Sequence, residues 1–310
     1  MKCLVTGGAG FIGSHIIEHL LKKGHNVVCL DNLDPCYDIE AKKANISQFQ
    51  TENFDFVEGD IRNKELLEKL FIDIDYIFHE AALVSVVESM RDPIKTFEIN
   101  TIGTANILKV AKDNNVKKVI IASSAAVYGD SPELPKKENM IPSPKSPYAI
   151  SKLDCEYLAR IYYHEYELKT TSLRYFNVYG PGQDPTSPYA AAIPIFIKKA
   201  LGNQDITIYG DGSQTRDFIF VKDLVQVNEI VMNKGDGCII NAANGSVISI
   251  IELAELIIEL TGSNSKIIHQ EPRPGDIKHS LADINELMKT EFRPKFDLEK
   301  GLKDTIEWFR

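Results

Sequence analysis

Tyr148 and Lys152 are the residues of this 310-residue sequence whose types and spacing most directly suggest chemistry, in the run SPYAISK over residues 146–152. Ser146 suits a helix N-cap and Pro147 the first helical position, so the two side chains are expected on one helical face. A free tyrosine has a pKa near ~10, but an adjacent ammonium and the positive helix end lower it. The pair could therefore remove a proton from a hydroxyl group, although such pairs are also commonplace on helix surfaces.

A serine-bearing strand end supplies part of the setting that the pair needs. The run IASSAAVYG over residues 121–129 predicts a buried strand that ends at two serines. A hydroxyl at that point can donate to a reacting hydroxyl or accept from it. We expect one of Ser123 and Ser124 to act in this way and the other to be a polar cap of the strand.

A glycine-rich turn, TGGAGFIG over residues 6–13, follows an apolar strand and opens a helix that ends at Gly24. Glycines permit the tight turn and bring the backbone close to a pyrophosphate, whose charge lies at the helix N-terminus. Alone the motif is weak, because a plain strand–turn–helix can carry the same glycines. The cofactor contacts predicted in this turn are Gly7, Gly10, Phe11, Ile12 and Gly13.

Asp31 ends the second predicted strand, where a carboxylate can bind the ribose hydroxyls of a dinucleotide. No Arg or Lys stands between it and Lys42, and an acid repels a 2′-phosphate, so NAD is favoured over NADP. Ligands of open α/β sheets bind at the carboxyl ends of the strands. The further strand-end candidates for cofactor contact are Asn32, Asp60, Ile61, Ala81, Ala82, Leu83 and Ala122.

The elements that must position these residues alternate along the first half of the chain. Strands are predicted over residues 2–6, 26–31, 54–58, 76–80, 118–123 and 170–174, and helices over 11–23, 64–70, 94–114 and 148–166. This alternation predicts an α/β fold, a Rossmann-type doubly wound parallel sheet. Turn formers dominate after Asn177. We therefore expect an NAD-binding domain over 1–177, with returning elements around 217–243, including a strand at 238–241, and a smaller mixed α/β substrate domain over 178–310, with a helix at 249–261.

The composition excludes several classes of protein. A net charge of −9 without a basic run argues against nucleic acid as a partner. No apolar stretch approaches the ~20 residues that span a bilayer, and no cleavable signal is apparent. Five cysteines without paired spacing argue against disulfides and zinc, and seven histidines show no ligand spacing. We expect a cytoplasmic enzyme without a metal.

Together these residues resemble the extended short-chain dehydrogenase/reductase family, and within it the UDP-hexose 4-epimerases (UDP-glucose or UDP-N-acetylglucosamine). The resemblance covers nearly the whole chain. Further motifs that carry it are HEAAL at 79–83, RDP at 91–93, Asn100, LRYFN at 173–177, GDGSQTRD at 210–217 and PRPGD at 272–276. It implies tightly bound NAD, a UDP-sugar substrate, and a homodimer that pairs the long helices at 94–114 and 148–166.

The resemblance also implies residue roles. Ser124, Tyr148 and Lys152 form the catalytic triad, Asn100 supports the site and its water structure, and Tyr175, Phe176 and Asn177 lie beside the nicotinamide and the sugar. Arginines are expected on the diphosphate, since a planar guanidinium suits bidentate phosphate contact, and an aspartate on the uridine ribose. The implied substrate contacts are Ser85, Ser124, Tyr148, Asn177, Ala192, Arg216, Arg273, Asp276 and Ser280.

The implied reaction is cyclic: tyrosinate takes the proton of the sugar 4-hydroxyl, NAD⁺ takes hydride from C4, and the hydride returns to the other face of a 4-keto sugar. Dehydratases and decarboxylases of the family typically carry an acid where this chain has Ala126, because elimination needs a further acid/base group. Ser280 stands where a tyrosine excludes N-acetyl groups, which implies activity on both acetylated and non-acetylated sugars. Val84 and Ala191 depart from a common lysine and asparagine, and leave the sugar open.

Three alternatives remain open at this point. A UDP-uronate 4-epimerase would need a cation for the sugar carboxylate, which the sequence does not place. A nucleotide-sugar dehydratase or reductase shares the cofactor site. A non-catalytic dinucleotide sensor would usually lack the Tyr148–Lys152 pair, which is present.

Overall fold

The computed structural model describes residues 1–35, 38–185, 191–272 and 277–310. The chain divides into two compact units. Unit 1 comprises Met1–Gly129, Ile141–Tyr175 and Val225–Ile240, and unit 2 comprises Asp130–Met140, Phe176–Leu224 and Asn241–Arg310. Each unit is described by itself below. Among the described residues, no helix is both long and apolar enough to cross a membrane.

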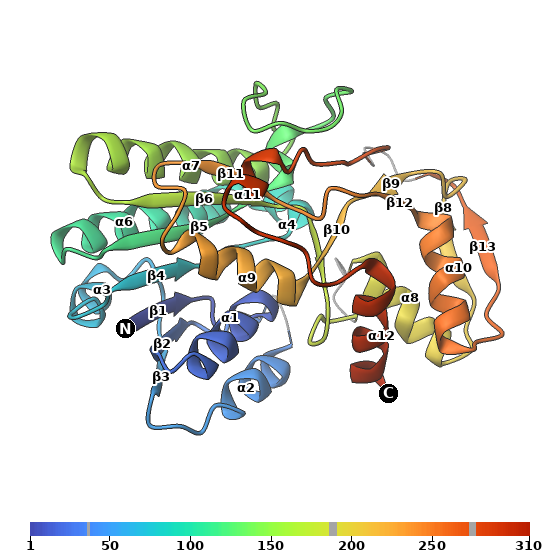
Figure 1. Ribbon diagram of the computed structural model, residues 1–310, viewed down its shortest axis with the longest axis horizontal. Coiled ribbons are helices and arrows are strands. Elements are labelled where there is room, and N and C mark those ends of the chain that lie inside the picture. Colours follow the sequence, from blue (N-terminus) through green and yellow to red (C-terminus); the bar gives the residue numbers. More distant parts are fainter. Residues whose placement is uncertain (36–37, 186–190, 273–276) are drawn as a thin grey trace. The chain divides into compact units, whose positions relative to one another are not determined.

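A seven-stranded sheet in the order β11-β6-β5-β4-β1-β2-β3 forms the centre of unit 1 (Figure 1). Its strands are β1 (Lys2–Thr6), β2 (Asn26–Asp31), β3 (Phe54–Glu58), β4 (Tyr76–His79), β5 (Lys118–Ser124), β6 (Thr170–Tyr175) and β11 (Ile239–Ala242). All pairings from β3 through β6 are parallel. The central strands are buried on both faces, which is why they read as continuous apolar runs. The predicted Rossmann-type sheet is confirmed, as is the returning strand near residue 238.

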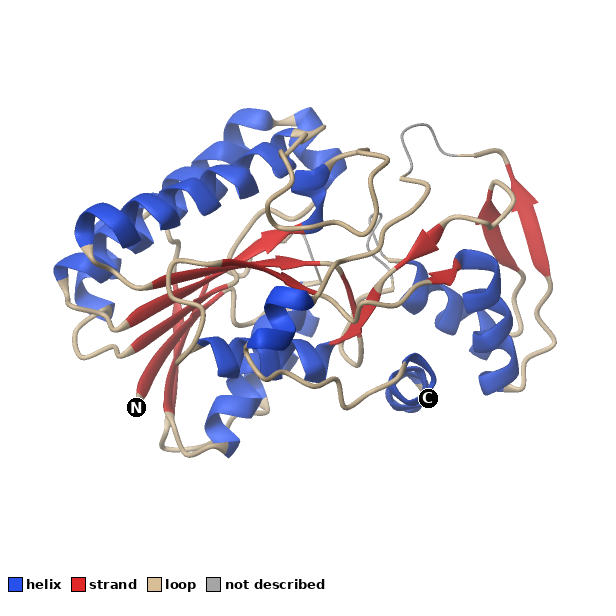
Figure 2. Ribbon diagram, turned by 45° about the horizontal axis from the view of Figure 1, so that its top comes forward, coloured by secondary structure: helices blue, strands red, loops and turns tan. Residues whose placement is uncertain are grey.

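Helices cover both faces of this sheet (Figure 2). They are α1 (Phe11–Lys22), α2 (Ile39–Ser47), α3 (Lys64–Leu70), α4 (Val86–Arg91), α5 (Pro93–Phe97), α6 (Gly103–Asp113), α7 (Pro147–Tyr166) and the second half of α9 (Val221–Val231). A core of aliphatic side chains, with Phe71 among them, fills the space between the sheet and α3, α6 and α7. The predicted start of α7 is confirmed, since Ser146 caps it by accepting from Ala149 N–H and Pro147 is its first residue.

The single long helix predicted over residues 94–114 is wrong in one respect. The structure divides it into α5, a π-helical turn η1 (Glu98–Ile102) and α6. Apolar periodicity does not report such a turn, because the residues on either side keep a helical pattern. π-Turns within helices are often found at functional sites, and this one carries Asn100.

In its described residues, unit 2 has short strands, the first half of α9 and the helices α8 (Ala192–Leu201), α10 (Ile250–Thr261), α11 (Asn285–Lys289) and α12 (Leu298–Phe309). Its strands pair as β7 (Asn177–Tyr179) with β10 (Phe218–Phe220), β9 (Thr215–Arg216) with β12 (Ile248–Ser249), and β8 (Ile206–Tyr209) with β13 (Ile267–Gln270). The predicted helix at 249–261 is confirmed as α10. Ser249 and Glu252 form a capping box at its start, and Gly262, at φ 65°, ends it.

Candidate functional site

The glycine-rich turn between β1 and α1 is too crowded for side chains. A Cβ on Gly7, where φ is +69°, would lie 2.6 Å from the Ala81 backbone nitrogen, and one on Gly13 would lie 2.4 Å from the Gly7 carbonyl oxygen. Gly10 is the N-cap of α1 and leaves the helix end without a side-chain cap, and the first turn, from Phe11 and Ile12 onward, has no acidic residue. This cradle fits a pyrophosphate at a helix N-terminus.

Asp31, at the end of β2, is buried beside this turn. Its Oδ2 accepts from the Ala9 N–H at 3.1 Å, and its Oδ1 accepts from the Leu33 N–H at 2.9 Å. The structure also brings Lys42 of α2 to 3.6 Å from Asp31 Oδ1, with only 10% of the lysine side chain exposed. Asn45, one turn further along α2, donates to the Ala9 carbonyl. α2 therefore packs against the glycine-rich turn.

The sequence reasoning missed Lys42 as a residue of this site. Lys42 is the first basic residue after Asp31 in the sequence, eleven positions further along the chain. α2 has no apolar stripe that would have predicted a helix, so nothing in the pattern showed that the chain returns to Asp31 at that point.

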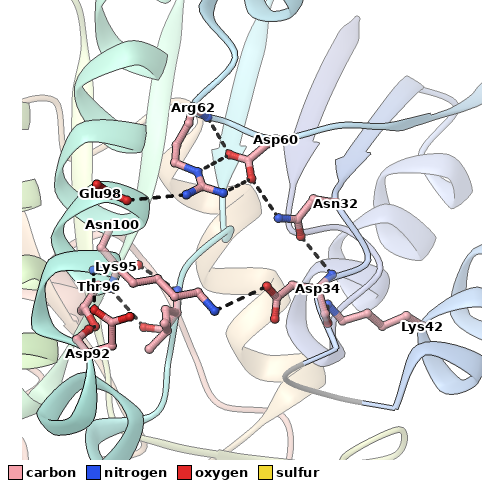
Figure 3. A network of polar contacts seen from close by, with 11 residues as sticks. Asn32, Asp34, Lys42, Asp60, Arg62, Asp92, Lys95, Thr96, Glu98 and Asn100 are labelled. Carbon is pink, nitrogen blue, oxygen red and sulfur yellow. Dashed lines mark hydrogen bonds and ion pairs between the residues drawn. The ribbon is translucent and has the colours of Figure 1, made fainter.

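A network of polar contacts lies at the carboxyl end of β3, the strand next to β2 (Figure 3). Arg62 donates twice to the Asp60 carboxylate, at 2.9 and 2.7 Å, and Asn32 donates to the same carboxylate at 3.0 Å. The Arg62 hydrogen bonds lower the pKa of Asp60 to about 2, so this carboxylate stays ionised. Arg62 also lies 3.8 Å from Glu98 of the π-turn, which links the network to the segment of Asn100.

Asn100 joins the loop after β4 to α7. Its Oδ1 accepts from the Leu83 N–H at 2.8 Å, and its Nδ2 donates to the Leu83 carbonyl at 3.0 Å and to Ser151 Oγ at 2.9 Å. Leu83 follows Ala81 and Ala82 at the end of β4. Ser151 immediately precedes Lys152, so Asn100 of the π-turn fixes both the loop after β4 and the helix that carries Tyr148 and Lys152.

Lys152 is 5% exposed and donates to the Ala122 carbonyl of β5 at 2.7 Å. Ala122 lies two residues before Ser124 in β5, so this bond joins the lysine to the strand end that carries Ser124. Ser124 caps a short 3-10 helix, η2 (Ala125–Tyr128), and its Oγ accepts from the Ala126 N–H at 3.1 Å. Tyr148 lies one turn before Lys152 on α7 and is half-buried. The predicted triad is thus carried by α7 and the end of β5, two elements that pack together.

Ser123, the other serine of the pair, lies in a buried network behind the site. It donates to Glu156 of α7, which receives two hydrogen bonds from Arg174 of β6 at 2.8 and 2.7 Å. The Arg174 guanidinium also stacks over the Tyr128 ring at 4.7 Å. The hydroxyl of Ser123 is thus already engaged with Glu156, and the network ties β5, β6 and α7 together.

His79, at the end of β4, connects the glycine turn to the π-turn. Thr104 Oγ1 donates to the Asn100 carbonyl, so it accepts from His79 Nε2–H at 2.9 Å, which leaves Nδ1 to accept from Thr6 Oγ1 at 2.7 Å. Burial lowers the pKa of His79 to about 3, with the Lys152 charge adding to the effect. The imidazole is therefore neutral at physiological pH and serves as a structural link.

Asp217 organises the candidate substrate residues of unit 2. Its buried carboxylate accepts from Asn244, Gly245 and Ala282 N–H groups, at 3.0, 3.1 and 3.2 Å, and burial raises its pKa to about 6. Asn177 donates from Nδ2 to the Asp217 carbonyl at 2.9 Å. Asp217 thereby joins the strand of Asn177 to the segment that leads to Ala282.

Arg216 and Ser280 lie on two backbones that pair within unit 2. The Ser280 N–H donates to the Thr215 carbonyl at 3.1 Å, and Arg216 Nη1 donates to the Thr215 carbonyl at 3.0 Å. Of the other predicted substrate residues, Ala192 begins α8 and Ser85 of unit 1 caps α4. Arg273 and Asp276 lie outside the described residues. Within the described ranges, no group of His, Cys, Asp or Glu is placed to hold a metal ion.

The parallel sheet, the glycine-rich turn and the helix that carries Tyr148 and Lys152 are together typical of dinucleotide-binding α/β enzymes. A family model described as the NAD dependent epimerase/dehydratase family matches residues 3–243. The chain belongs to this NAD-dependent family.

Individual relatives differ in their reactions. A solved UDP-N-acetylglucosamine 4-epimerase from Methanobrevibacter ruminantium M1 is 41% identical, with a TM-score of 0.94 over 99% of this chain and 97% of that one. A UDP-glucose 4-epimerase from Thermotoga maritima, solved with UDP-glucose, is 37% identical, with a TM-score of 0.93 over 100% and 99%. A UDP-N-acetyl-alpha-D-glucosaminuronate decarboxylase from Bacillus cytotoxicus is 37% identical over 100% of this chain and 98% of its own.

Proposed function

We propose that this protein is an NAD-dependent 4-epimerase that interconverts UDP-glucose with UDP-galactose and UDP-N-acetylglucosamine with UDP-N-acetylgalactosamine. The proposal is carried by the position of Lys152. It lies one helical turn after Tyr148 on α7 and donates to the Ala122 carbonyl of β5, two residues before Ser124. The likeness to two solved 4-epimerases supports it. The cofactor contacts that we propose are those predicted above, with Lys42 added.

Tyr148 is the proposed acid/base group of the reaction. Its phenolic oxygen can take the proton of the sugar 4-hydroxyl and later return it, with the buried Lys152 one helical turn away on α7. Because Ser124 Oγ accepts the Ala126 N–H, its own hydrogen can be donated to the reacting oxygen. Bound NAD supplies the hydride acceptor and donor at C4.

NAD is expected to be held by the cradle and the strand ends. The crowding at Gly7 and Gly13 excludes side chains from the turn, so a phosphate can approach its backbone closely. Asp31 with Lys42 presents paired charges where the adenosine ribose is expected. Asn100 keeps the loop of Leu83 in place through its paired hydrogen bonds.

The reaction type rests on the residues around Ser124. Ala126 stands where an additional acid/base group would serve elimination or decarboxylation, and a methyl group cannot move a proton. The decarboxylase likeness makes this distinction necessary, because overall similarity does not separate the two reactions. UDP-uronate 4-epimerisation remains the nearest alternative.

A substrate panel tests the proposal. The purified protein would be incubated without added cofactor with UDP-galactose, UDP-N-acetylgalactosamine, UDP-glucuronate and UDP-N-acetylglucosaminuronate, and the products separated by anion-exchange chromatography. We expect 4-epimers of both neutral sugars and no carbon dioxide from the uronates. Turnover confined to the uronates would replace the neutral-sugar proposal with the alternative, and carbon dioxide release would overturn the epimerase assignment.

We further propose that the enzyme is a homodimer in the cytoplasm. Large apolar side chains of α4, α5 and α7 are exposed in unit 1, including Met90 at 62% and Ile94 at 70%. Such clustered exposure in one set of helices is typical of a protein–protein contact. The buried free thiols of Cys3 and Cys29 suit a reducing compartment.

A further inference from the structure

Glu80 directly follows β4 and lies against the glycine-rich turn. Its backbone N–H donates to the Thr6 carbonyl at 3.1 Å, and a Cβ on Gly7 would lie 2.9 Å from the Glu80 carbonyl carbon. The chain thus carries a carboxyl group at the sheet edge where a dinucleotide is expected. A carboxylate in that position needs a physical account, because a full negative charge disfavours a nearby pyrophosphate.

The Glu80 side chain is held by two other elements of unit 1. The hydroxyl of Tyr175, the last residue of β6, donates to Glu80 Oε1 at 2.8 Å. Asn228 of α9 donates from Nδ2 to that hydroxyl at 3.0 Å. Tyr175 and Asn228 are both buried, so β4, β6 and α9 fix the carboxyl group in one orientation.

Two titratable groups act on Glu80, Tyr175 from β6 and Lys152 from α7. Desolvation raises the pKa of Glu80 to about 7, against the smaller lowering effects of the Tyr175 hydrogen bond and the Lys152 charge. β1 meets it with the Thr6 and Gly7 backbone, and α9 with the uncharged Asn228. Burial holds the pKa of Tyr175 well above 10, so in the neutral range it is the carboxyl that titrates.

We propose that Glu80 lets the site discriminate between the oxidised, cationic and the reduced, neutral form of the nicotinamide dinucleotide. The inference rests on the proposed function, because it takes the surroundings of Lys152 as the place of the nicotinamide. An ionised carboxylate within electrostatic range of Lys152 attracts a positively charged ring and has no comparable attraction for the uncharged dihydro form. Since the proposed cycle ends with oxidised cofactor, this bias keeps the enzyme ready for the next substrate.

Competition between the two dinucleotides tests the proposal without any sugar substrate. The protein would be equilibrated with equal concentrations of NAD⁺ and NADH at several values from about pH 6 to about pH 8. After rapid gel filtration, the bound forms would be quantified by chromatography. We expect the bound ratio of NAD⁺ to NADH to rise with pH, on the order of tenfold in total for charges roughly a nanometre apart.

Variants separate the outcomes. Glu80→Gln should make the ratio independent of pH, whereas Tyr175→Phe should keep the rise and move its midpoint upward, because the carboxylate loses a donor. Glu68→Gln, on the exposed face of α3, is the matched control and should behave as the wild type. An unchanged pH profile in Glu80→Gln, or a flat profile in the wild type, overturns this proposal alone. A protein that retains neither dinucleotide overturns the proposed function as well.

Discussion

The Lys152 ammonium donates to the carbonyl oxygen of Ala122 at 2.7 Å, which anchors α7 to β5 two residues before Ser124. The bond neutralises little of the lysine charge, because a carbonyl is a dipole and not an ion. It fixes the position of the cation while its field continues to act on His79 and Glu80.

Removing the hydroxyl of Tyr148 should strongly reduce turnover while the protein stays folded. Tyr148→Phe is expected to lower kcat by roughly 10²–10⁴-fold, the range of a lost acid/base group, with bound NAD retained. Tyr166→Phe, at the exposed end of the same helix, is the matched control. Steady-state epimerase assays with UDP-galactose measure both. Near-normal turnover in Tyr148→Phe would remove Tyr148 from the catalytic role.

Lys42 should affect the choice of cofactor. It lies 3.6 Å from Asp31, so it offsets part of the negative charge that repels a 2′-phosphate. Lys42→Met is therefore expected to raise the preference for NAD⁺ over NADP⁺ by about tenfold, with calorimetric dissociation constants as the measure. Lys64→Met, which removes an exposed charge on α3, should leave the preference unchanged. A preference that falls in Lys42→Met would contradict the arrangement.

His79 should make stability depend on acidity. Its pKa is about 3 in the folded protein, against 6.5 as the ordinary value, so the folded state stays neutral where the unfolded state gains a proton. As the pH falls from 6.5 towards 3, the residue should cost the protein about 1.4 kcal/mol per pH unit.

Urea unfolding of the wild type and of His79→Gln at a series of pH values measures this contribution. The free energy of unfolding of the wild type should fall more steeply with acidification than that of His79→Gln. His164→Gln, an exposed histidine of α7, should show the wild-type slope. Equal slopes in wild type and His79→Gln would show that the imidazole is not buried and neutral as described.

Ser280 should decide which sugars fit. It lies half-buried beside the Arg216 strand. In the proposed substrate site, a tyrosine at this position takes up the space of an N-acetyl group. Ser280→Tyr is expected to reduce kcat/KM for UDP-N-acetylgalactosamine by roughly tenfold or more, and that for UDP-galactose far less. Ser280→Ala controls for the lost hydroxyl. Unchanged turnover of the acetylated sugar in Ser280→Tyr would show that residue 280 does not control access of N-acetyl groups.

The exposed apolar helices predict a dimer that charge can dissociate. Ile94→Asp is expected to shift the protein from dimer towards monomer in light scattering, because an aspartate cannot be buried without a partner. Ile72→Asp, at an exposed apolar residue beyond α3, is the control. A wild type that is monomeric at micromolar concentration would contradict the proposed assembly.

The sequence predicts the parallel sheet well, because its strands are short apolar runs separated by clear helical segments. The glycine turn, Asp31 and the start of α7 are likewise local signals. The contact between Lys42 and Asp31 could not be predicted, since it depends on how a weakly patterned helix folds back. The π-turn at Asn100 could not be predicted either, because helical periodicity continues through it.

The buried side-chain hydrogen bonds that join neighbouring elements of unit 1 could not be predicted from the sequence either. Glu156 and Arg174 are charged residues in segments predicted as a helix and a strand, and only the packing shows that they face each other. The same holds for Glu80 and Tyr175, which are 95 residues apart. Such pairs follow from the order of strands in the sheet, which alternation along the chain does not specify.

The most direct test of the proposed epimerase follows the hydrogen at C4. UDP-galactose deuterated at C4 would be converted by the purified protein without added NAD, and the UDP-glucose product analysed by mass spectrometry and proton NMR. We expect the deuterium to stay at C4 in the product, with no net reduced cofactor formed. Product that has lost the label to solvent, or a requirement for stoichiometric NAD, would contradict it.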